Sequence, residues 1–489
     1  MRTGADYKAA LRDGRKVVIM GGDAIDDVTT HPATAAMVEQ YVAWYDRHSD
    51  PAWSDILLSP SGQPWAYVSP RTVADVQAIG RSIAKTIFLS AGNITHTPLY
   101  GHLIAMGVVV ATETQDAAPH YVANAAAYRE EIARTQRFIT FCGGAAIIGQ
   151  RLQPNPKDRI SVKLVRETDK GMIVRGRLGM HTSPAYAEDV YVGHMTGLQI
   201  DGHPIGFIVP VGTAGATTLC RKISARPENP FMAPLSSRYD ELDGQMWLDD
   251  VLIPWERVFA VDPAPEAIPR WLRWHHLYGW LAKAEFTLGL TLALVDSMGL
   301  KEHEATVEYL VDVIAEVQTV RSCIVAAECG ADFTPSGYCV PNHAHLAAGG
   351  IALFKARQRI SEILRIVPGS SLVVAPSDAD LAMPELAQGL EESFGGNGYT
   401  ARQRAALLQL AWDHVSSALD ARESAFELHA SGGLPGWRHW LRRSFRDYNE
   451  LANAVLELIH FPMPEIDVTG IGTALPAARR ASAPPASKK

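Results

Sequence analysis

The chain has 489 residues, of which 47% are hydrophobic and 20% are charged, and its formal net charge is −8. A chain of this length exceeds what one hydrophobic core usually supports, so we expect two or three packed units. The acidic balance argues against a nucleic-acid partner, because phosphate binding requires a basic face.

The sequence also bears on cellular context. No apolar run reaches the roughly 18 residues needed to span a bilayer, and the opening MRTGADY lacks the apolar core of a signal peptide. We therefore expect a cytoplasmic protein with no membrane segment. The five cysteines stand at unrelated spacings without a CxxC pair, which indicates buried thiols rather than a disulfide framework or a zinc site.

Residues 1–138 are expected to form a mainly helical domain. Apolar residues recur at helical spacing over 71–83, and residues 121–137 are rich in the helix formers Ala and Glu. Within this part, residues 15–25 favour a short hairpin, because Gly21 and Gly22 can supply positive φ between two strands.

From about 160 to 260 the apolar period changes to two. Residues 161–167 and 172–178 predict a hairpin around 168–171. Further strands are predicted over 187–192, 204–211 and 245–253, and the last ends at Pro254 because proline cannot donate to a ladder. Several short strands at regular spacing predict a β-barrel or sandwich for a middle domain at 139–265.

After Trp271 the pattern returns to helix. Long segments rich in Ala, Leu and Glu, joined by short Gly and Pro breaks, predict an antiparallel bundle over residues 266–470. These segments are 271–298, 302–330, 344–366, 401–428 and 440–460. Residues 471–489 are dominated by Ala, Pro, Ser and basic residues and are expected to form a flexible tail.

Three groups of residues resemble a known family. They are MRTGADY, LRDGR and DVTTHP within residues 1–32, the segment LSSRYDELDGQMWLDDVLIPWERVF at 235–259, and FGGNGY at 394–399 with LAWD at 410–413. These segments are similar in sequence to the oxygenase component of two-component aromatic monooxygenases, the 4-hydroxyphenylacetate 3-monooxygenase family. The resemblance implies an α+β fold of the acyl-CoA dehydrogenase type, with an N-terminal helical domain, a middle β-barrel and a C-terminal helical bundle.

The resemblance also implies a chemistry. Such enzymes accept reduced FAD from a separate NAD(P)H:flavin reductase, form a flavin C4a-hydroperoxide with O2 and hydroxylate a small aromatic substrate, usually a phenol. Family bundle packing implies a homotetramer or homodimer. Electrophilic hydroxylation needs a water-poor cleft, a positioned ring and a base that takes the phenol proton.

Two catalytic residues follow from the resemblance. His275 falls where relatives that oxidise chlorophenols and nitrophenols carry an essential histidine, which implies the base. Thr182 matches a threonine whose hydroxyl lies near flavin N5, where it can stabilise the oxygen adduct. Ser183 replaces the glycine that usually follows this threonine and is also expected to contact the cofactor. His276 lies about 100° further around the helix and is expected to be structural.

The expected substrate-binding residues are His96, Tyr100 and Phe141. The segment THTPLY at 95–100 aligns with a family motif in which an arginine holds phenolate or carboxylate; His96 replaces that arginine and Tyr100 is retained. Phe141 stands where a substrate-contacting histidine is expected. Since histidine is only conditionally charged, these replacements argue against 4-hydroxyphenylacetate and favour a more apolar or uncharged aromatic.

The expected flavin contacts lie in two segments. A gap-free alignment puts Ile148, Gly149 and Gln150 at the family's flavin loop, whereas a shifted alignment offers residues 155–159. Ser416, Ser417 and Arg422 resemble a bundle segment that contacts the FAD diphosphate and adenosine, for which hydroxyls and an arginine are suitable.

Three alternatives share the fold. An acyl-CoA dehydrogenase-like flavoenzyme would need a carboxylate base beside the flavin, and the sequence does not identify one. A 4-hydroxybutyryl-CoA dehydratase-like enzyme needs cysteine ligands for an iron–sulfur cluster, but no cysteine lies near His96 or soon after His275. A non-catalytic flavin-binding relative stays open, because the family's arginine and histidine are both replaced.

Overall fold

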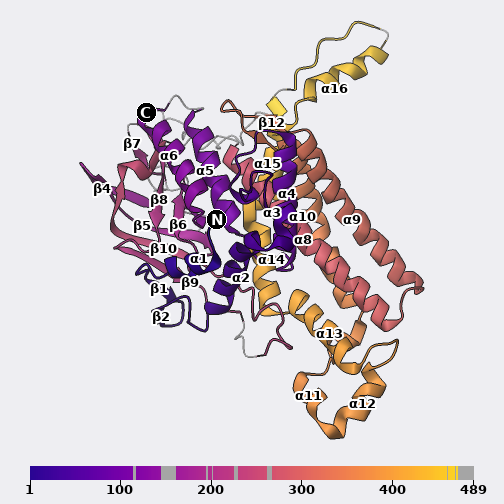
Figure 1. The fold of residues 1–489 in the computed structure, drawn as a ribbon. Coiled ribbons are helices and arrows are strands. Elements are labelled where there is room, and N and C mark those ends of the chain that lie inside the picture. The colour runs from indigo at the N-terminus through magenta and orange to yellow at the C-terminus, as the bar shows by residue number, and fades with distance from the viewer. Residues whose placement is uncertain are drawn as a thin grey trace, which may run out of the picture.

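The computed structural model describes residues 1–113, 117–144, 161–193, 197–200, 202–224, 229–260, 267–459, 461–468 and 470–471. The N-terminal helices and the sheet form one side of the molecule, and long bundle helices form the other (Figure 1). The order of helices, strands and helices predicted from sequence periodicity is confirmed. Among the described residues, no helix combines the length and apolar character needed to cross a bilayer.

The N-terminal part is mainly helical, as predicted, and two of its helices begin with reciprocal caps. Thr3 and Asp6 cap α1, and Thr72 and Asp75 cap α4 in the same way, so that orphan backbone N–H groups are satisfied. The helices are α1 (Gly4–Ala10), α2 (Ala35–Asp46), α3 (Ser54–Leu57), α4 (Val73–Phe88), α5 (Pro98–Glu113) and α6 (Pro119–Thr135).

The strands of the described residues join into one large sheet and one small pair. The strands are β1 (Val17–Ile19), β2 (Asp23–Ile25), β3 (Ile139–Cys142), β4 (Val162–Thr168), β5 (Gly171–Thr182), β6 (Asp189–Val192), β7 (Gln199–Ile200), β8 (His203–Pro210), β9 (Ala216–Cys220), β10 (Asp243–Pro254), β11 (Val258–Ala260), β12 (Asp332–Phe333) and β13 (Cys339–Val340). The large sheet follows the path β11-β8-β6-β3-β5-β10-β9-β1-β2, with β4 beside β5 and β7 beside β8. This linear order does not confirm the closed barrel that we expected.

The early hairpin is confirmed, and it belongs to the sheet rather than to the helical part. β1 and β2 are antiparallel, and Gly21 and Gly22 between them have φ of 112° and 132°, which glycine adopts without steric cost. β1 also pairs in parallel with β9. The start of the chain therefore extends a sheet whose other strands come from residues 139–260.

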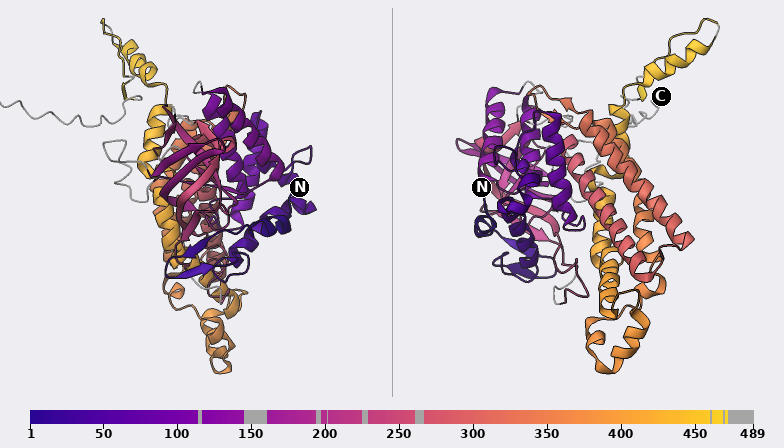
Figure 2. Two further views of the ribbon diagram at one scale, coloured as in Figure 1. Left: turned by 90° about the vertical axis from the view of Figure 1, so that its left-hand side faces the viewer. Right: turned by 45° about the vertical axis from the view of Figure 1, so that its right-hand side comes forward.

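The bundle consists of long helices with two smaller extensions. Its helices are α8 (Ala267–Met298), α9 (Glu304–Cys329), α10 (His343–Ile366), α11 (Asp378–Ala382), α12 (Pro384–Phe394), α13 (Ala401–Val415), α14 (Ala418–His429), α15 (Gly433–Ser444) and α16 (Tyr448–Ala454). The segments with α11–α12 and with α16 project from opposite ends of the bundle (Figures 1 and 2). The single helix expected over 401–428 is two helices, because the Ser417 side chain accepts from Leu419 and Asp420 N–H groups and starts a new one.

One close contact sets the position of the candidate site. Helix α5 crosses β3 at Gly101, where an added Cβ would lie 2.6 Å from the Ile139 Cβ. Only a residue without a side chain permits this approach. Tyr100, next to Gly101, and Phe141, on β3, are therefore brought to the same helix–sheet boundary.

Candidate active site

The end of strand β5 is held by a buried hydrogen-bonding turn. Ser183 follows Thr182 with φ of 57°, a left-handed conformation that favours glycine. Its N–H donates to the Leu242 carbonyl at 2.8 Å, and its hydroxyl donates to Glu241 Oε1 at 2.7 Å. The polar side chain therefore compensates for the strain of the backbone at this position.

Glu241 is completely buried and joins this turn to the loop before α5. It accepts the backbone N–H groups of Thr95 (3.1 Å) and His96 (3.0 Å), the Thr95 hydroxyl, and the Tyr41 hydroxyl at 3.2 Å. Burial raises the pKa of Glu241, and the nearby Arg422 charge and the hydroxyl donors counteract this rise. One carboxyl group thus fixes the loop that carries His96 against the end of β5.

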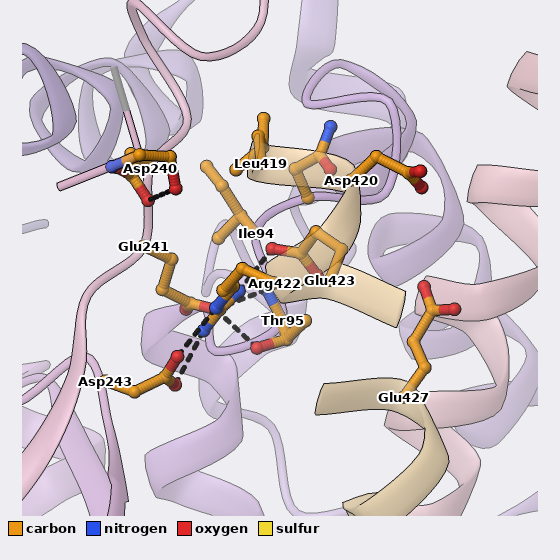
Figure 3. A network of polar contacts seen from close by, with 12 residues as sticks. Ile94, Thr95, Asp240, Glu241, Asp243, Leu419, Asp420, Arg422, Glu423 and Glu427 are labelled. Atoms are coloured by element: carbon orange, nitrogen blue, oxygen red, sulfur yellow. Dashed lines mark hydrogen bonds and ion pairs between the residues drawn. The ribbon is translucent and has the colours of Figure 1, made fainter. Parts of the chain in front are cut away.

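Arg422, on α14, lies among three carboxyl groups (Figure 3). Its Nε and Nη2 atoms donate to the two Asp243 carboxylate oxygens, each at 2.6 Å. Its Nη1 donates to Glu423, and its Nη2 lies 3.9 Å from Glu241 Oε2. Burial raises the pKa of Glu423 to about 7. The arginine therefore ties the bundle to the start of β10 by charge-assisted hydrogen bonds.

Three of the residues predicted for the site lie together, and a fourth joins them. Tyr100 has its ring centroid 4.3 Å from that of His96, 5.3 Å from that of His275 and 5.5 Å from that of His276. The helical-wheel argument that separated His276 from this cluster was wrong, because Tyr100 contacts both neighbouring histidines of α8. His276 also bonds through Nδ1 to the Ser431 hydroxyl at 2.8 Å.

The imidazoles of this cluster are neutral near pH 7. Burial lowers the pKa of His96 and of His276 to about 3, and it lowers the pKa of His275 well below its usual value. His96 therefore does not supply the positive charge of the arginine that it replaces. His275 Nε2 lies 3.2 Å from the Thr97 hydroxyl, so its other nitrogen is available to a ligand.

Two further predicted residues lie on the sheet side. Phe141, on β3, is half-buried against the core between sheet and helices, with its ring centroid 6.1 Å from that of Tyr191. The Thr182 hydroxyl hydrogen-bonds to Asp243. Burial raises the pKa of that carboxyl, but the charges of Arg422 and Arg221 and the hydrogen bonds from Arg422 and Thr182 together lower it. Thr182 thus lies next to the ion pair between Arg422 and Asp243.

The predicted flavin segments differ in how far the structure describes them. Ile148, Gly149 and Gln150, like the alternative segment 155–159, lie outside the described residues. The Ser416 hydroxyl lies 3.5 Å from Arg365 Nε, and the Ser417 hydroxyl caps α14. A phosphate at Arg422 would have to compete with Asp243 and Glu423, so the role of these residues stays a prediction.

Sequence reasoning missed three polar residues of this region. Glu241 and Asp243 lie in the segment at 235–259, which was interpreted as a strand and its approach. His181 precedes Thr182, is fully buried, and has Nε2 2.9 Å from the Thr140 hydroxyl. The acidic residues around 240 were a usable signal, because carboxylates clustered before a buried strand require partners.

Comparisons with known proteins now identify the family. A model described as "4-hydroxyphenylacetate 3-hydroxylase N terminal" matches residues 3–260, and its C-terminal counterpart matches residues 271–457. The chain belongs to the 4-hydroxyphenylacetate 3-hydroxylase family. The expected resemblance is thereby confirmed, and the two models together include every residue of the cluster around Tyr100.

Individual 4-hydroxyphenylacetate 3-hydroxylase relatives align over most of their length. The oxygenase component of 4-nitrophenol 4-monooxygenase/4-nitrocatechol 2-monooxygenase from Rhodococcus opacus is 29% identical, over 87% of this chain and 85% of that protein. The oxygenase component of 4-hydroxyphenylacetate 3-monooxygenase from Thermus thermophilus is 28% identical, over 87% and 91%. A crystal structure of the oxygenase component (HpaB) of 4-hydroxyphenylacetate 3-monooxygenase complexed with FAD has a TM-score of 0.83 at 26% identity, covering 94% of this chain and 99% of that one.

The Arg422 pair yields a stability prediction with a matched control. Arg422→Met leaves Asp243, Glu241 and Glu423 without their common cation, so the free energy of unfolding should fall by about 3–5 kcal/mol. Arg175→Met breaks a similar two-bonded pair with Asp250, but both partners are exposed, and the loss of stability should be much smaller because solvent screens the pair. Urea unfolding of both variants measures the difference; equal losses would contradict a structural role for Arg422.

The buried histidines predict acid lability. A histidine whose folded pKa lies below its unfolded value binds protons first in the unfolded chain, so stability is full above about pH 6.5 and is lost as pH falls. His414, whose pKa burial lowers to about 3, should contribute about 2 kcal/mol of this loss at pH 5. The Tm should therefore fall from pH 7.5 to pH 5, and less steeply in His414→Gln.

The control for this titration is His345→Gln, at an exposed position on the same bundle. It should reproduce the pH dependence of the unaltered protein. A Tm that stays constant between pH 7.5 and pH 5 would show that the buried imidazoles titrate alike in the folded and unfolded states.

Proposed function

We propose that the chain is the oxygenase component of a two-component, FADH2-dependent monooxygenase that hydroxylates a small aromatic substrate with O2. A separate NAD(P)H:flavin reductase supplies the reduced FAD. The observation that carries the proposal is the buried cluster of His275, Tyr100 and His96 close to the Thr182–Ser183 turn. Relatives of similar length are named monooxygenases, and one of them forms a complex with FAD.

The polar atoms of this region fit a flavin ring. His181 Nδ1, His275 Nδ1 and His276 Nε2 are all buried without a hydrogen-bond partner in the described part of the chain. Buried polar atoms are normally satisfied, so several such nitrogens in one region indicate a ligand that bonds to them. The edge of an isoalloxazine ring and the hydroxyl of a phenol both offer complementary groups.

The chain itself would orient the substrate and move one proton. His275 is neutral and buried, so its unpartnered Nδ1 can accept a phenol proton in a water-poor environment. The Tyr100 and His276 rings provide aromatic surfaces near that imidazole, with centroids 5.3 Å and 6.2 Å from its own. Thr182 would contact the flavin through its hydroxyl, and the bound reduced cofactor would supply the electrons that activate O2.

The structure places carboxyl groups near the site, and a dehydrogenase would need one as its base. Their hydrogen bonds argue against that role. Glu241 accepts hydrogen bonds from two backbone N–H groups and three hydroxyls, which occupy its lone pairs. A carboxylate held in this way is a scaffold group. The retained His275 and Thr182 favour catalysis over the non-catalytic reading.

We also propose that a second copy of the chain covers the outer face of α9. This long helix lies at the outside of the bundle (Figures 1 and 2). Val307, Val311, Ile314 and Val325 follow one another at intervals of four, three and eleven residues, which are close to one, one and three helical turns, and each is 39–57% exposed. An apolar stripe of this length indicates an interface, and helices of two copies would meet along it to form a homodimer or homotetramer.

The functional proposal is tested with reduced FAD prepared anaerobically. The protein is mixed with reduced FAD and a phenol, O2 is added, and product, O2 consumed and H2O2 released are measured. The unaltered protein should couple most O2 to product, whereas His275→Ala should bind FAD nearly as tightly but hydroxylate at least about 100-fold more slowly, with O2 released as H2O2.

The control for this experiment is His345→Ala, which should behave as the unaltered protein does. Equal coupling in His275→Ala would remove that residue from the reaction. If a panel of phenols gave no hydroxylated product with the unaltered protein, the monooxygenase assignment itself would be wrong.

The interface proposal is tested by size. Val311→Asp combined with Ile314→Asp should shift the mass measured by light scattering from an oligomer toward a monomer, because two buried charges would face each other across the helices. Val165→Asp, at an equally exposed valine on β4, is the control and should leave the mass unchanged. An unaltered mass in the double variant would place the interface elsewhere.

A further inference from the structure

Arg273, two residues before His275, is a buried cation in unusual surroundings. Its residue surface is only 6% exposed. The guanidinium carbon lies 5.6 Å from the ring centroid of Trp437 and 4.5 Å from that of Trp440. Its nitrogens reach His343 Nε2 at 3.4 Å and the Ser431 carbonyl at 3.5 Å, and its Nε is buried without a partner in the part of the chain that the structure describes.

No Asp or Glu carboxylate in the described part of the chain forms an ion pair with Arg273, and burial alone lowers its pKa to about 9. Arg404 is also buried without a carboxylate partner among the described residues, but its guanidinium donates to the carbonyls of Ser297, Phe394, Gly395 and Gly396. Two further, largely buried arginines have carboxylate partners. Arg422 has Asp243 and Glu423, and Arg2 has both oxygens of Glu188. Arg273 therefore stays charged near pH 7 without a negative partner among the residues that the structure describes.

Aromatic faces compensate for only part of such a charge. Contacts with indole rings stabilise a cation by a small fraction of what full desolvation costs. The remaining positive potential acts on nearby groups, and it contributes to the lowered pKa of His276, after burial and the influence of His96. The same charge is the first cause after burial of the lowered pKa of His343. Of these two imidazoles, His276 is the one that contacts Tyr100.

Ser431 connects the guanidinium to the cluster around Tyr100. Its carbonyl faces Arg273, and its hydroxyl bonds to His276. Ser431, Gly432 and Gly433 have φ of 55°, 84° and 61°, so three successive left-handed residues hold this loop in a conformation that serine rarely adopts. Arg273 is therefore separated from the proposed substrate site by one hydrogen-bonded layer.

The charges on that site are otherwise few. His96, His275 and His276 are neutral near pH 7, and the Glu241 and Asp243 carboxyl groups are compensated by Arg422 and their donors. None of these groups therefore offers a free negative charge that could balance Arg273. An anionic ligand beside His276 and Tyr100 would balance it.

We propose that Arg273 is a positioning residue that makes this site bind its aromatic ligand as the phenolate. The proposal rests on the proposed function, because it concerns the same site, and it replaces the expectation of an uncharged aromatic, which considered only His96 and Phe141. The phenol O–H bond breaks on binding, its electron pair stays on oxygen and its proton passes to the buffer. The pKa of a bound phenol should therefore fall by about one unit or more.

The test uses 4-nitrophenol, whose phenolate form absorbs visible light, as a probe with the whole protein and without flavin or O2 turnover. The pH of half-ionisation is measured for free and bound probe. It should be lower for the probe bound to the unaltered protein, return close to the free value in Arg273→Met, and stay lowered in Arg273→Lys, which keeps the charge. Arg443→Met, at an exposed arginine whose guanidinium carbon lies 5.8 Å from the ring centroid of Trp440, is the matched control and should retain the shift.

An unshifted pKa in the unaltered protein, or a shift that survives in folded Arg273→Met, overturns the proposal. If Arg273→Met does not fold, loss of the pKa shift in folded Arg273→Lys overturns the proposal. The absence of saturable probe binding to the unaltered protein also overturns it. The outcome is separable from the activity test. A coupled hydroxylase without the shift contradicts only the role of Arg273, and a shift without hydroxylated product contradicts only the proposed reaction.

Discussion

The burial of Glu241 is the constraint on which the candidate site depends. This carboxyl group lies where the loop before α5, the end of β5 and the bundle helix α14 meet, and each contributes a group that faces it. A buried charge is tolerated only if such partners are present together. The three parts of the chain must therefore be assembled before any of them is stable in this arrangement, and that assembly brings His96 and Tyr100 to α8.

Much of the architecture followed from periodicity, because amphipathic elements show their buried faces in sequence. The β4–β5 hairpin and the helices α4 and α9 were predicted in this way. Helix α5 was not, since nearly all of its residues are buried and a helix that is apolar all round has no polar face to mark its period. The partners of Glu241 were also invisible, because they lie about 60 and 145 residues away along the chain.

Residue roles proved harder to predict than elements. The resemblance led to His275 and Tyr100, which the structure brings together, but a wheel projection placed His276 away from them. Such a projection describes one helix in isolation, and it carries no information on a partner that is wide enough to contact two neighbouring positions. Arg422 was matched to a phosphate contact by chemistry alone, whereas the structure surrounds it with carboxyl groups that compete for the same donors.

The distribution of satisfied and unsatisfied polar atoms separates scaffold from reaction site. Glu241 and the Asp243 carboxylate have their hydrogen bonds within the chain, so a ligand has little to offer them. His181, His275 and His276 each retain a buried nitrogen without a partner among the described residues, and leaving such an atom unpaired costs about 1–3 kcal/mol. That cost is recovered when a ligand supplies the missing bonds, so it contributes to ligand affinity instead of to folding. Arg273, which has no carboxylate partner among the described residues, extends this division from hydrogen bonds to charge, since an anionic ligand would stabilise the buried cation.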